Sequence, residues 1–247
     1  MERSEYDKLD RVEDRMWWFA ALHRNLLTSY RWAPTRRANL PALDAGCGTG
    51  GFLARFAETY PERAIFGLDV DSNACLRAAD KSACPVGAGS LDQLPFADGA
   101  FSMIISADVL CHGGVNEHLA LRQFHRCLAK DGSLILNLPA YRWMLSRHDA
   151  AVHNVRRYTV YTLRSLLYTT GFATVYMSYW NTILFPFMVV TRKLSSGSAS
   201  DVKLYTRPID ILCRSATSLE TALLRMGVRL PFGGSLIAIA KRGIGHA

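Results

Sequence analysis

Three glycines in one short segment are the first residues whose spacing indicates chemistry. Gly46, Gly48 and Gly51 satisfy the pattern G-x-G-x-x-G, and Asp69 follows about 20 residues later. Glycine allows the backbone to turn tightly and to approach a ligand closely. A carboxylate at that distance can accept hydrogen bonds from ribose hydroxyl groups. The pattern predicts a nucleoside-binding loop, although a loop that only needs glycine conformations would show the same letters.

Asp44 distinguishes between two kinds of nucleoside cofactor, because it lies two residues before the first glycine. A dinucleotide such as NAD places its pyrophosphate at the helix that follows such a loop, where a carboxylate would repel it. S-adenosylmethionine has no phosphate, and a carboxylate attracts both its ammonium and its sulfonium group. Asp44 therefore favours S-adenosylmethionine over NAD. The structural alternative is that Asp44 caps the turn after it.

These residues resemble the class I S-adenosylmethionine-dependent methyltransferases. The segment Leu43–Gly50 (LDAGCGTG) resembles their first motif, Gly67–Asp69 their second, and Gly89–Phe96 the stretch that lines the adenine. Trp17–Phe19 and the segment from His148 to Tyr158 are similar to a bacterial subgroup of the methyltransferase type 11 kind. The resemblance covers residues 40 to 140 well. It implies that S-adenosylmethionine is the cofactor and S-adenosylhomocysteine the product.

The expected cofactor site joins these motif positions to two residues near the start of the chain. Its members are Asp44, Gly46, Cys47, Gly48, Gly50, Asp69, Val70, Ser90, Leu91, Asp108, Trp18 and Arg24. Trp18 would close over the cofactor and Arg24 would reach its carboxylate, unless the aromatic residues only attach the first helix to the core. Ser90 departs from the family, which usually has Asp there. Its hydroxyl can still accept a hydrogen bond from the adenine amino group, but without a charge.

Methyl transfer is an in-line displacement, and an oxygen or nitrogen acceptor can also need a general base. The candidate catalytic residues follow the fourth and fifth predicted strands and are His112, His148, Asp149, His153 and Tyr141. An Asp that orients a His could deprotonate a hydroxyl. The alternative is a loop whose polar groups satisfy each other, with Asp149 paired to Arg156 or Arg157. We expect no metal ion, because a well-spaced third strong ligand is not evident.

Seven short apolar segments that alternate with helical segments predict a doubly wound α/β sheet. The predicted strands are 40–43, 64–68, 85–88, 101–107, 134–138, 175–179 and 236–240. The resemblance implies the Rossmann-like, mostly parallel seven-stranded sheet of the class I methyltransferases. Ligands of such sheets bind beyond the carboxyl ends of the strands.

The chain is interpreted as one domain of four parts. These are an N-terminal helical lid (1–33), a core (38–180), an inserted helical and aromatic cap (181–233) and a last strand (234–242). We expect Ser72 to cap a helix, Lys130-Asp131-Gly132 to close the helix 116–128, and a helix from Pro208 to Met226 to carry one apolar face. That face consists of Leu212, Ala216, Leu219 and Leu223.

The net charge of +8 reflects either an anionic partner or a modest surplus of arginine, since no block of basic residues occurs. Six cysteines without paired spacing indicate free thiols in a reducing compartment. The longest apolar run, Ile183–Val190, is far shorter than the roughly 20 residues that span a bilayer. We expect a cytoplasmic protein, with the aromatic stretch 179–187 as a substrate lid, a peripheral contact with the inner face of the membrane, or core.

The leading functional hypothesis is methyl transfer to a small-molecule or a lipid- or glycan-linked acceptor, at oxygen. One alternative is an RNA or other nucleic-acid methyltransferase, suggested by the charge. The segment Ser106–Val109 disfavours it, because it lacks the Asn/Asp-Pro-Pro-Tyr type of sequence that holds a flipped base. Another alternative is a protein that binds S-adenosylmethionine without transferring its methyl group.

Overall fold

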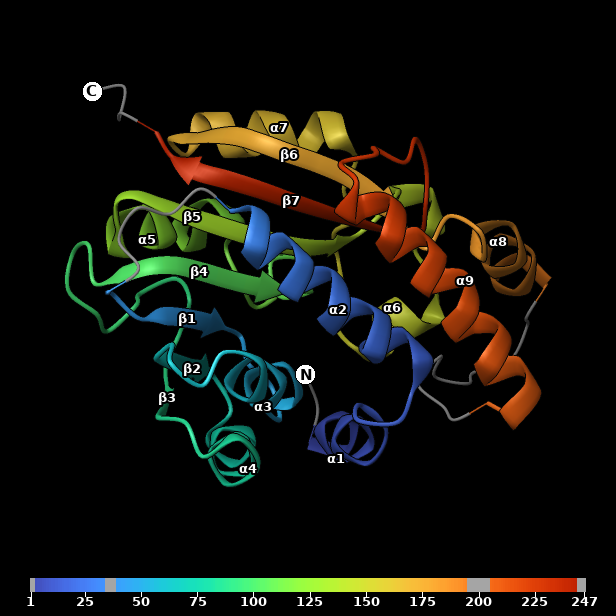
Figure 1. The fold of residues 1–247 in the computed structure, drawn as a ribbon, viewed down its shortest axis with the longest axis horizontal. Helices are drawn as coiled ribbons and strands as arrows, with labels where there is room; N and C mark the ends of the chain where they lie inside the picture. Colours follow the sequence, from blue (N-terminus) through green and yellow to red (C-terminus); the bar gives the residue numbers. More distant parts are fainter. Residues whose placement is uncertain (1–2, 34–38, 195–204, 244–247) are drawn as a thin grey trace.

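A computed structural model describes residues 3–33, 39–194 and 205–243, which form one seven-stranded sheet with helices on both faces (Figure 1). The strands are β1 (Ala42–Ala45), β2 (Ile65–Asp69), β3 (Val86–Ala88), β4 (Phe101–Ala107), β5 (Leu128–Pro139), β6 (Phe172–Trp180) and β7 (Ser235–Arg242). Their order is β3-β2-β1-β4-β5-β7-β6, and β7 runs antiparallel to both of its neighbours. The predicted α/β class and mostly parallel seven-stranded sheet are confirmed.

Helices cover the sheet in two layers. They are α1 (Arg3–Val12), α2 (Trp17–Trp32), α3 (Gly51–Thr59), α4 (Ser72–Ser82), α5 (Glu117–Cys127), η1 (Arg142–Met144), α6 (Arg147–Ala151), α7 (Val160–Thr169), α8 (Phe185–Leu194) and α9 (Arg207–Arg225). Helices α2, α3 and α9 lie on one face of the sheet, and α5 and α7 on the other (Figure 1). The segment between β6 and β7 supplies α8 and α9.

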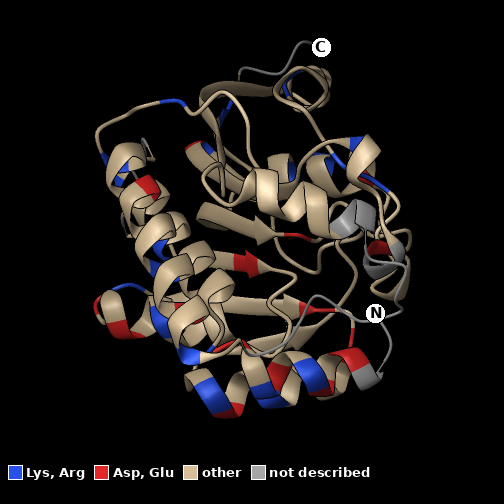
Figure 2. Cartoon of the chain, turned by 90° about the vertical axis from the view of Figure 1, so that its right-hand side faces the viewer, with Lys and Arg blue, Asp and Glu red and all other residues tan. Residues whose placement is uncertain are grey.

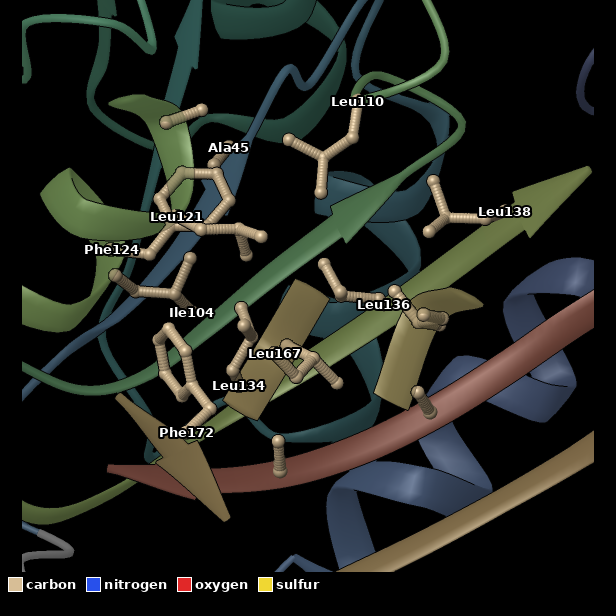
Figure 3. Close-up of a cluster of buried hydrophobic side chains, with 14 of the residues drawn as sticks. Ala45, Ile104, Leu110, Leu121, Phe124, Leu134, Leu136, Leu138, Leu167 and Phe172 are labelled. Carbon is tan, nitrogen blue, oxygen red and sulfur yellow. The ribbon is translucent and has the colours of Figure 1, made fainter. Parts of the chain in front are cut away.

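Successive residues of the central strands point to opposite faces of the sheet, so each strand contributes to two hydrophobic clusters. Ile104 of β4 and Leu134 of β5 pack with Phe124 of α5 on one face (Figure 3). Their neighbours Met103 and Ile135 are equally buried on the other face, against α2 and α3. This double burial holds the strand ends in a fixed plane, and the loops that follow them therefore have fixed positions.

The N-terminal helical region consists of two helices, separated by residues 13–16. Two local predictions were wrong. Asp71, not Ser72, caps α4, because its carboxylate accepts hydrogen bonds from the backbone N–H groups of Asn73 and Ala74, both at 2.9 Å. The segment Lys130-Asp131-Gly132 does not close α5: Leu128 already pairs with Phe101, and these residues form an irregularity in β5 before the pairing resumes.

The helix α9 was predicted in the right place, and the apolar face predicted for it does not turn toward the core. Leu212 and Leu219 are 66% and 58% exposed, whereas Thr217, Glu220 and Thr221 are buried. The partner helix α2 explains this, because its polar residues need hydrogen-bond partners there: Thr221 Oγ1 donates to Asn25 Oδ1 at 2.7 Å. Within the described residues, no helix is both long and apolar enough to cross a membrane.

Candidate active site

The glycine loop connects β1 to α3 and has the left-handed backbone that glycine tolerates best. The φ angles are 87° at Gly46 and 88° at Gly50. A Cβ at Gly50 would lie 2.6 Å from the Cα of Ala78, so this glycine allows α3 and α4 to pack closely. Gly46 and Gly48 line a cavity, whereas Gly50 does not.

The cavity has a volume of about 1000 Å³ and lies beyond the carboxyl ends of the strands. Figure 2 looks onto this side of the molecule, where acidic positions mark the strand tips and α1 runs beneath them. Of the predicted site residues, the following line the cavity: Trp18, Asp44, Gly46, Cys47, Gly48, Asp69, Val70, Ser90, Leu91, Asp108, His112, Asp149 and His153. The structure thus brings most of both predicted sets into one space.

Asp44, at the end of β1, is buried, and its Oδ2 atom has no hydrogen-bond partner among the described residues. Burial, followed by the nearby Asp69 and Glu13 carboxylates, raises the pKa of Asp44 to about 8. An unpartnered acceptor that faces a cavity among other carboxylates attracts a cation. The ammonium group of S-adenosylmethionine fits this requirement, and the donor set around the glycine loop therefore suits that cofactor.

Asp69, at the end of β2, accepts three hydrogen bonds. Oδ1 accepts from the Tyr6 hydroxyl at 2.9 Å and from the backbone N–H of Asp71 at 3.1 Å, and Oδ2 accepts from the backbone N–H of Gly48 at 2.9 Å. A carboxylate offers roughly four acceptor positions. One position on Oδ2 therefore stays open toward a ribose hydroxyl. The bond from Gly48 also couples the orientation of Asp69 to the glycine loop.

Sequence reasoning missed the contribution of α1 to this site. Tyr6 and Leu9 of α1 and Glu13, which directly follows the helix, all line the cavity, and their spacing of three and four places them on one side. Glu13 is buried, accepts a hydrogen bond from Thr49 Oγ1 at 2.7 Å and pairs with Lys81 of α4. Burial raises the pKa of Glu13, although Lys81 opposes this effect. The helical spacing was the available signal.

Ser90 and Leu91 follow β3 and line the cavity at its far side. The Ser90 hydroxyl accepts a hydrogen bond from the backbone N–H of Asp92 at 3.2 Å, so it already shapes the local turn. The hydroxyl proton of Ser90 can still be donated, because a hydroxyl is both donor and acceptor. Leu91 is buried and offers an apolar surface to a planar base.

Asp108 follows β4 with a left-handed φ of 55° and is held by the neighbouring strand. Asn137 Nδ2 donates to Asp108 Oδ2 at 2.9 Å, and Trp180 Nε1 donates to Asn137 Oδ1 at 2.7 Å. The bond from Trp180 fixes the Asn137 amide so that its NH₂ group must face Asp108. Burial raises the pKa of Asp108 to about 7, against the lowering effects of Asn137 and Arg157.

His112 lies in the loop after β4, with Nδ1 3.0 Å from the Val152 carbonyl oxygen. A carbonyl oxygen only accepts hydrogen bonds, so Nδ1 carries the proton and Nε2 is the basic nitrogen. Burial lowers the pKa of His112, which keeps the ring neutral at neutral pH. A neutral imidazole with a fixed tautomer can accept a proton at Nε2.

Asp149 is not available as a simple partner for a histidine. Its carboxylate accepts hydrogen bonds from Arg157 at 2.8 Å and from the Ser146 hydroxyl at 2.8 Å, and both charged side chains of this ion pair are almost fully buried. The arrangement matches the alternative in which the polar groups of this loop satisfy each other. His153 lines the cavity, and the side chain of His148 lies outside the described part of the chain.

Besides Gly50, two predicted site residues lie away from the cavity lining. Arg24 Nη2 donates to Thr217 Oγ1 at 3.3 Å, so Arg24 lies against α9 and does not reach the glycine loop. Tyr141 stacks on Tyr179, with ring centroids 5.2 Å apart and planes 12° apart. Long-range packing decides where these two side chains point. Trp17, by contrast, lines the cavity beside Trp18.

Comparison with known proteins adds a sequence match to this geometry. Residues 43–136 match the family model of a methyltransferase domain. The chain is 25% identical over 181 residues to a malonyl-[acyl-carrier protein] O-methyltransferase of Geobacter sulfurreducens, an alignment that covers 65% of this chain and 67% of the relative.

Two solved structures show the same fold. One is from the complex between the Haloferax volcanii Trm112 methyltransferase activator and a methyltransferase, with a TM-score of 0.62, 17% identity, and 99% and 100% of the two chains covered. The other is geranyl diphosphate C-methyltransferase from Streptomyces coelicolor A3(2), bound to S-adenosyl-L-homocysteine, with a TM-score of 0.55, 13% identity, and 82% and 71% covered. The matched domain and the methyltransferase relative support an S-adenosylmethionine-dependent methyltransferase, and the two structures show that the chain shares the class I methyltransferase fold.

Proposed function

We propose that this enzyme methylates an oxygen atom of an apolar small-molecule or lipid-linked acceptor. The observation that carries the proposal is the mixed lining of the cavity. Asp44, Asp69 and Ser90 line it at the ends of β1, β2 and β3, and we call this the acidic part. Apolar residues of α2 and α8, among them Phe187 and Met188, also line it, and we call this the apolar part; α8 follows β6, which lies at the opposite end of the strand order from β3. Ligand pockets usually measure about 300–1000 Å³, so a cavity at the upper end of this range suits two ligands.

In the acidic part, Asp44 would hold the ammonium group and Asp69 a ribose hydroxyl. The backbone at Gly46 and Gly48 allows close approach, and Leu91 would contact the adenine. S-adenosylmethionine would supply the methyl group and the leaving sulfur, while the protein aligns the two reactants. Tyr6 and Leu9 of α1 also line the cavity, and Tyr6 bonds to Asp69.

In the apolar part, His112 Nε2 accepts a proton from the methyl acceptor. This proton comes from a hydroxyl group or from a carboxylic acid group. The Val152 carbonyl oxygen holds the imidazole in the tautomer that this role needs. Two residues that line the cavity, Trp17 and Asn181, each have a buried polar atom (Nε1 and Oδ1) with no hydrogen-bond partner among the described residues. They are placed to bind a polar group of the acceptor, because buried polar atoms rarely stay unpaired.

The relatives support an oxygen acceptor and an apolar chain without identifying either. The Geobacter sulfurreducens relative is named as an O-methyltransferase of a malonyl group on an acyl-carrier protein. The Streptomyces coelicolor structure contains geranyl diphosphate beside S-adenosyl-L-homocysteine in the same fold. An acceptor carried on a lipid would fit the apolar residues Phe187 and Met188 of the cavity lining, and it would require a peripheral contact with the inner face of a membrane.

The test is formation of S-adenosylhomocysteine when the purified protein meets a panel of acceptors. The panel pairs long-chain with short-chain carboxylic acids, phenols and alcohols, and it includes matched amines and a malonyl thioester. We expect turnover with oxygen acceptors that carry a long apolar chain. Methylation confined to amines or to RNA would contradict the proposal, and product mass would show which atom gains the methyl group.

A further inference from the structure

Helix α9 presents an apolar stripe to solvent along most of its length. The α9 stripe consists of the exposed residues Ile209, Ile211, Leu212, Leu219 and Met226, with the half-buried Ala216 and Leu223 among them. Met226 is 68% exposed, and Ile211 is 55% exposed. Helices of soluble proteins normally turn such residues toward the core. In α9 the apolar side faces solvent, and the polar side faces the protein. Large exposed apolar surfaces of this kind mark interaction sites.

The inverted orientation is held by specific contacts and is not a matter of free rotation. Glu220 Oε1 accepts from the backbone N–H of Ile183 at 2.7 Å, and Thr221 Oγ1 donates to Asn25 of α2. If α9 rotated so that the stripe faced the core, Glu220 and Thr221 would lose these hydrogen bonds. The backbone N–H of Ile183 and the side chain of Asn25 would then lose their partners. The apolar side of α9 therefore stays outward in the folded protein.

The charges on α9 indicate what covers the stripe. The helix carries three arginines, Arg207, Arg214 and Arg225, at intervals of seven and eleven residues, which places them on one border of the stripe. Of its two acidic residues, Glu220 is buried and Asp210 pairs with Arg214 at 2.5 Å. An apolar face bordered by arginine is the pattern of helices that lie in the surface of an anionic membrane.

The stripe also continues into the cavity. Ile209, at the start of the stripe, is 46% exposed and lines the cavity at the same time. Phe187 of α8 is 68% exposed and lines the cavity as well. A lipid-borne acceptor could thus pass from a bilayer to the cavity along apolar side chains without crossing water.

We propose that α9 docks its outward apolar stripe on an anionic lipid bilayer, with the cavity mouth facing the membrane. Only the reason for the docking, access to a lipid-borne acceptor, rests on the proposed function. The docking itself requires neither cofactor nor methyl transfer. Failure of vesicle binding would leave the methylation proposal standing, and failure of methylation would leave the docking standing.

Co-sedimentation of the full chain with vesicles tests the docking. One set of vesicles is phosphatidylcholine alone, and the other contains about one third phosphatidylglycerol. We expect binding to the anionic vesicles, and weakening as the salt concentration rises, because salt screens the arginine contribution. The double variant Leu212→Ser/Leu219→Ser should bind at least about tenfold more weakly, since apolar burial drives insertion.

Two variants complete the design. Leu76→Ser on α4 is the matched control, because Leu76 is 66% exposed like Leu212 but lies outside the stripe, and it should bind vesicles as the unchanged protein does. Arg207→Gln/Arg225→Gln should lose the preference for anionic vesicles and keep the residual binding to neutral ones. Calorimetric binding of S-adenosylmethionine shows that each variant is folded.

Equal vesicle binding by the Leu212→Ser/Leu219→Ser variant and the unchanged protein would overturn the proposal. A second result would also overturn it: the unchanged protein is a dimer that binds no vesicles, and the double variant is a monomer. A second copy of the chain would then cover the stripe. Loss of binding in the Leu76→Ser control to the same degree would also overturn it, since the effect would not belong to α9.

Discussion

The substitution Asp44→Asn should weaken cofactor binding and stabilise the free protein. The Asp44 carboxyl is buried, its Oδ2 atom is unpartnered among the described residues, and its pKa is about 8 instead of the ordinary 3.8. An ionised Asp44 therefore destabilises the folded protein. Each unit of the pKa shift corresponds to about 1.4 kcal/mol, so the upper limit of this cost, reached above pH 8, is about 6 kcal/mol. Loss of a buried charge partner for the cofactor ammonium costs about 3 kcal/mol, or roughly a hundredfold in Kd.

The sign of the stability effect follows from the raised pKa. Between pH 3.8 and about 8 the folded protein holds a proton on Asp44 that the unfolded chain releases. The stabilisation associated with this proton is complete below pH 3.8 and is lost as pH rises through 8. The difference in unfolding free energy between Asp44→Asn and the unchanged protein should therefore be small near pH 4. It should grow in favour of the variant toward pH 8.

Calorimetry gives a second, independent readout of the same group. At pH 7 a carboxyl with a pKa of about 8 is roughly nine-tenths protonated, so binding of a cation there should release about 0.9 proton. Titrations in two buffers of different ionisation enthalpy measure this number. The Asp44→Asn variant should release none, and it should lose affinity equally for S-adenosylhomocysteine, which keeps the ammonium group.

Asp98→Asn on the exposed surface is the matched control and should change neither quantity. A variant at Asp44 that binds the cofactor within twofold of the unchanged protein would refute the placement of the ammonium group. Normal proton release with lost affinity would instead mean that another group supplies the proton, which would refute the electrostatic reasoning. Either result can be read without knowing the methyl acceptor.

Three further predictions concern other parts of the site. Arg157→Met leaves the Asp149 carboxylate buried without its partner and should lower the free energy of unfolding by about 3–5 kcal/mol in urea titrations. Gly50→Ala introduces a Cβ 2.6 Å from the Ala78 Cα at a φ of 88° and should cost at least about 2 kcal/mol in the same assay. His112→Gln should slow methyl transfer by about 10²–10⁴-fold while calorimetry shows unchanged cofactor affinity.

The strands and the glycine loop could be predicted because their signals are local. Residues 101–107 were predicted as a strand from an unbroken apolar run, and β4 has the same bounds. The position of Asp44 relative to Gly46 and Gly48 is fixed by the turn itself, so adjacent letters sufficed to place it at the cavity. Short-range geometry leaves little freedom at such positions.

The partners of the charged residues could not be predicted in the same way. The sequence analysis allowed Asp149 to pair with either Arg156 or Arg157, and only the path of the chain between α6 and α7 decides that the partner is Arg157. Arg24 faces α9, almost 200 residues later in the chain, through its contact with Thr217. Tyr6 reaches Asp69 because α1 folds back over the strand ends. Each of these contacts depends on the arrangement of whole helices.

Helix α9 shows how a failed rule can carry information. The spacing of Leu212, Leu219 and Leu223 predicted a helix, and the usual rule that apolar faces turn inward predicted its orientation. The helix is present, but the rule fails because α2 offers Asn25 to the polar side of α9. Local patterns that disagree with burial are expected mainly at functional sites, where a partner outside the fold completes the arrangement. The disagreement at α9 therefore points to a covering surface that the isolated chain lacks, and its arginine border points to an anionic one.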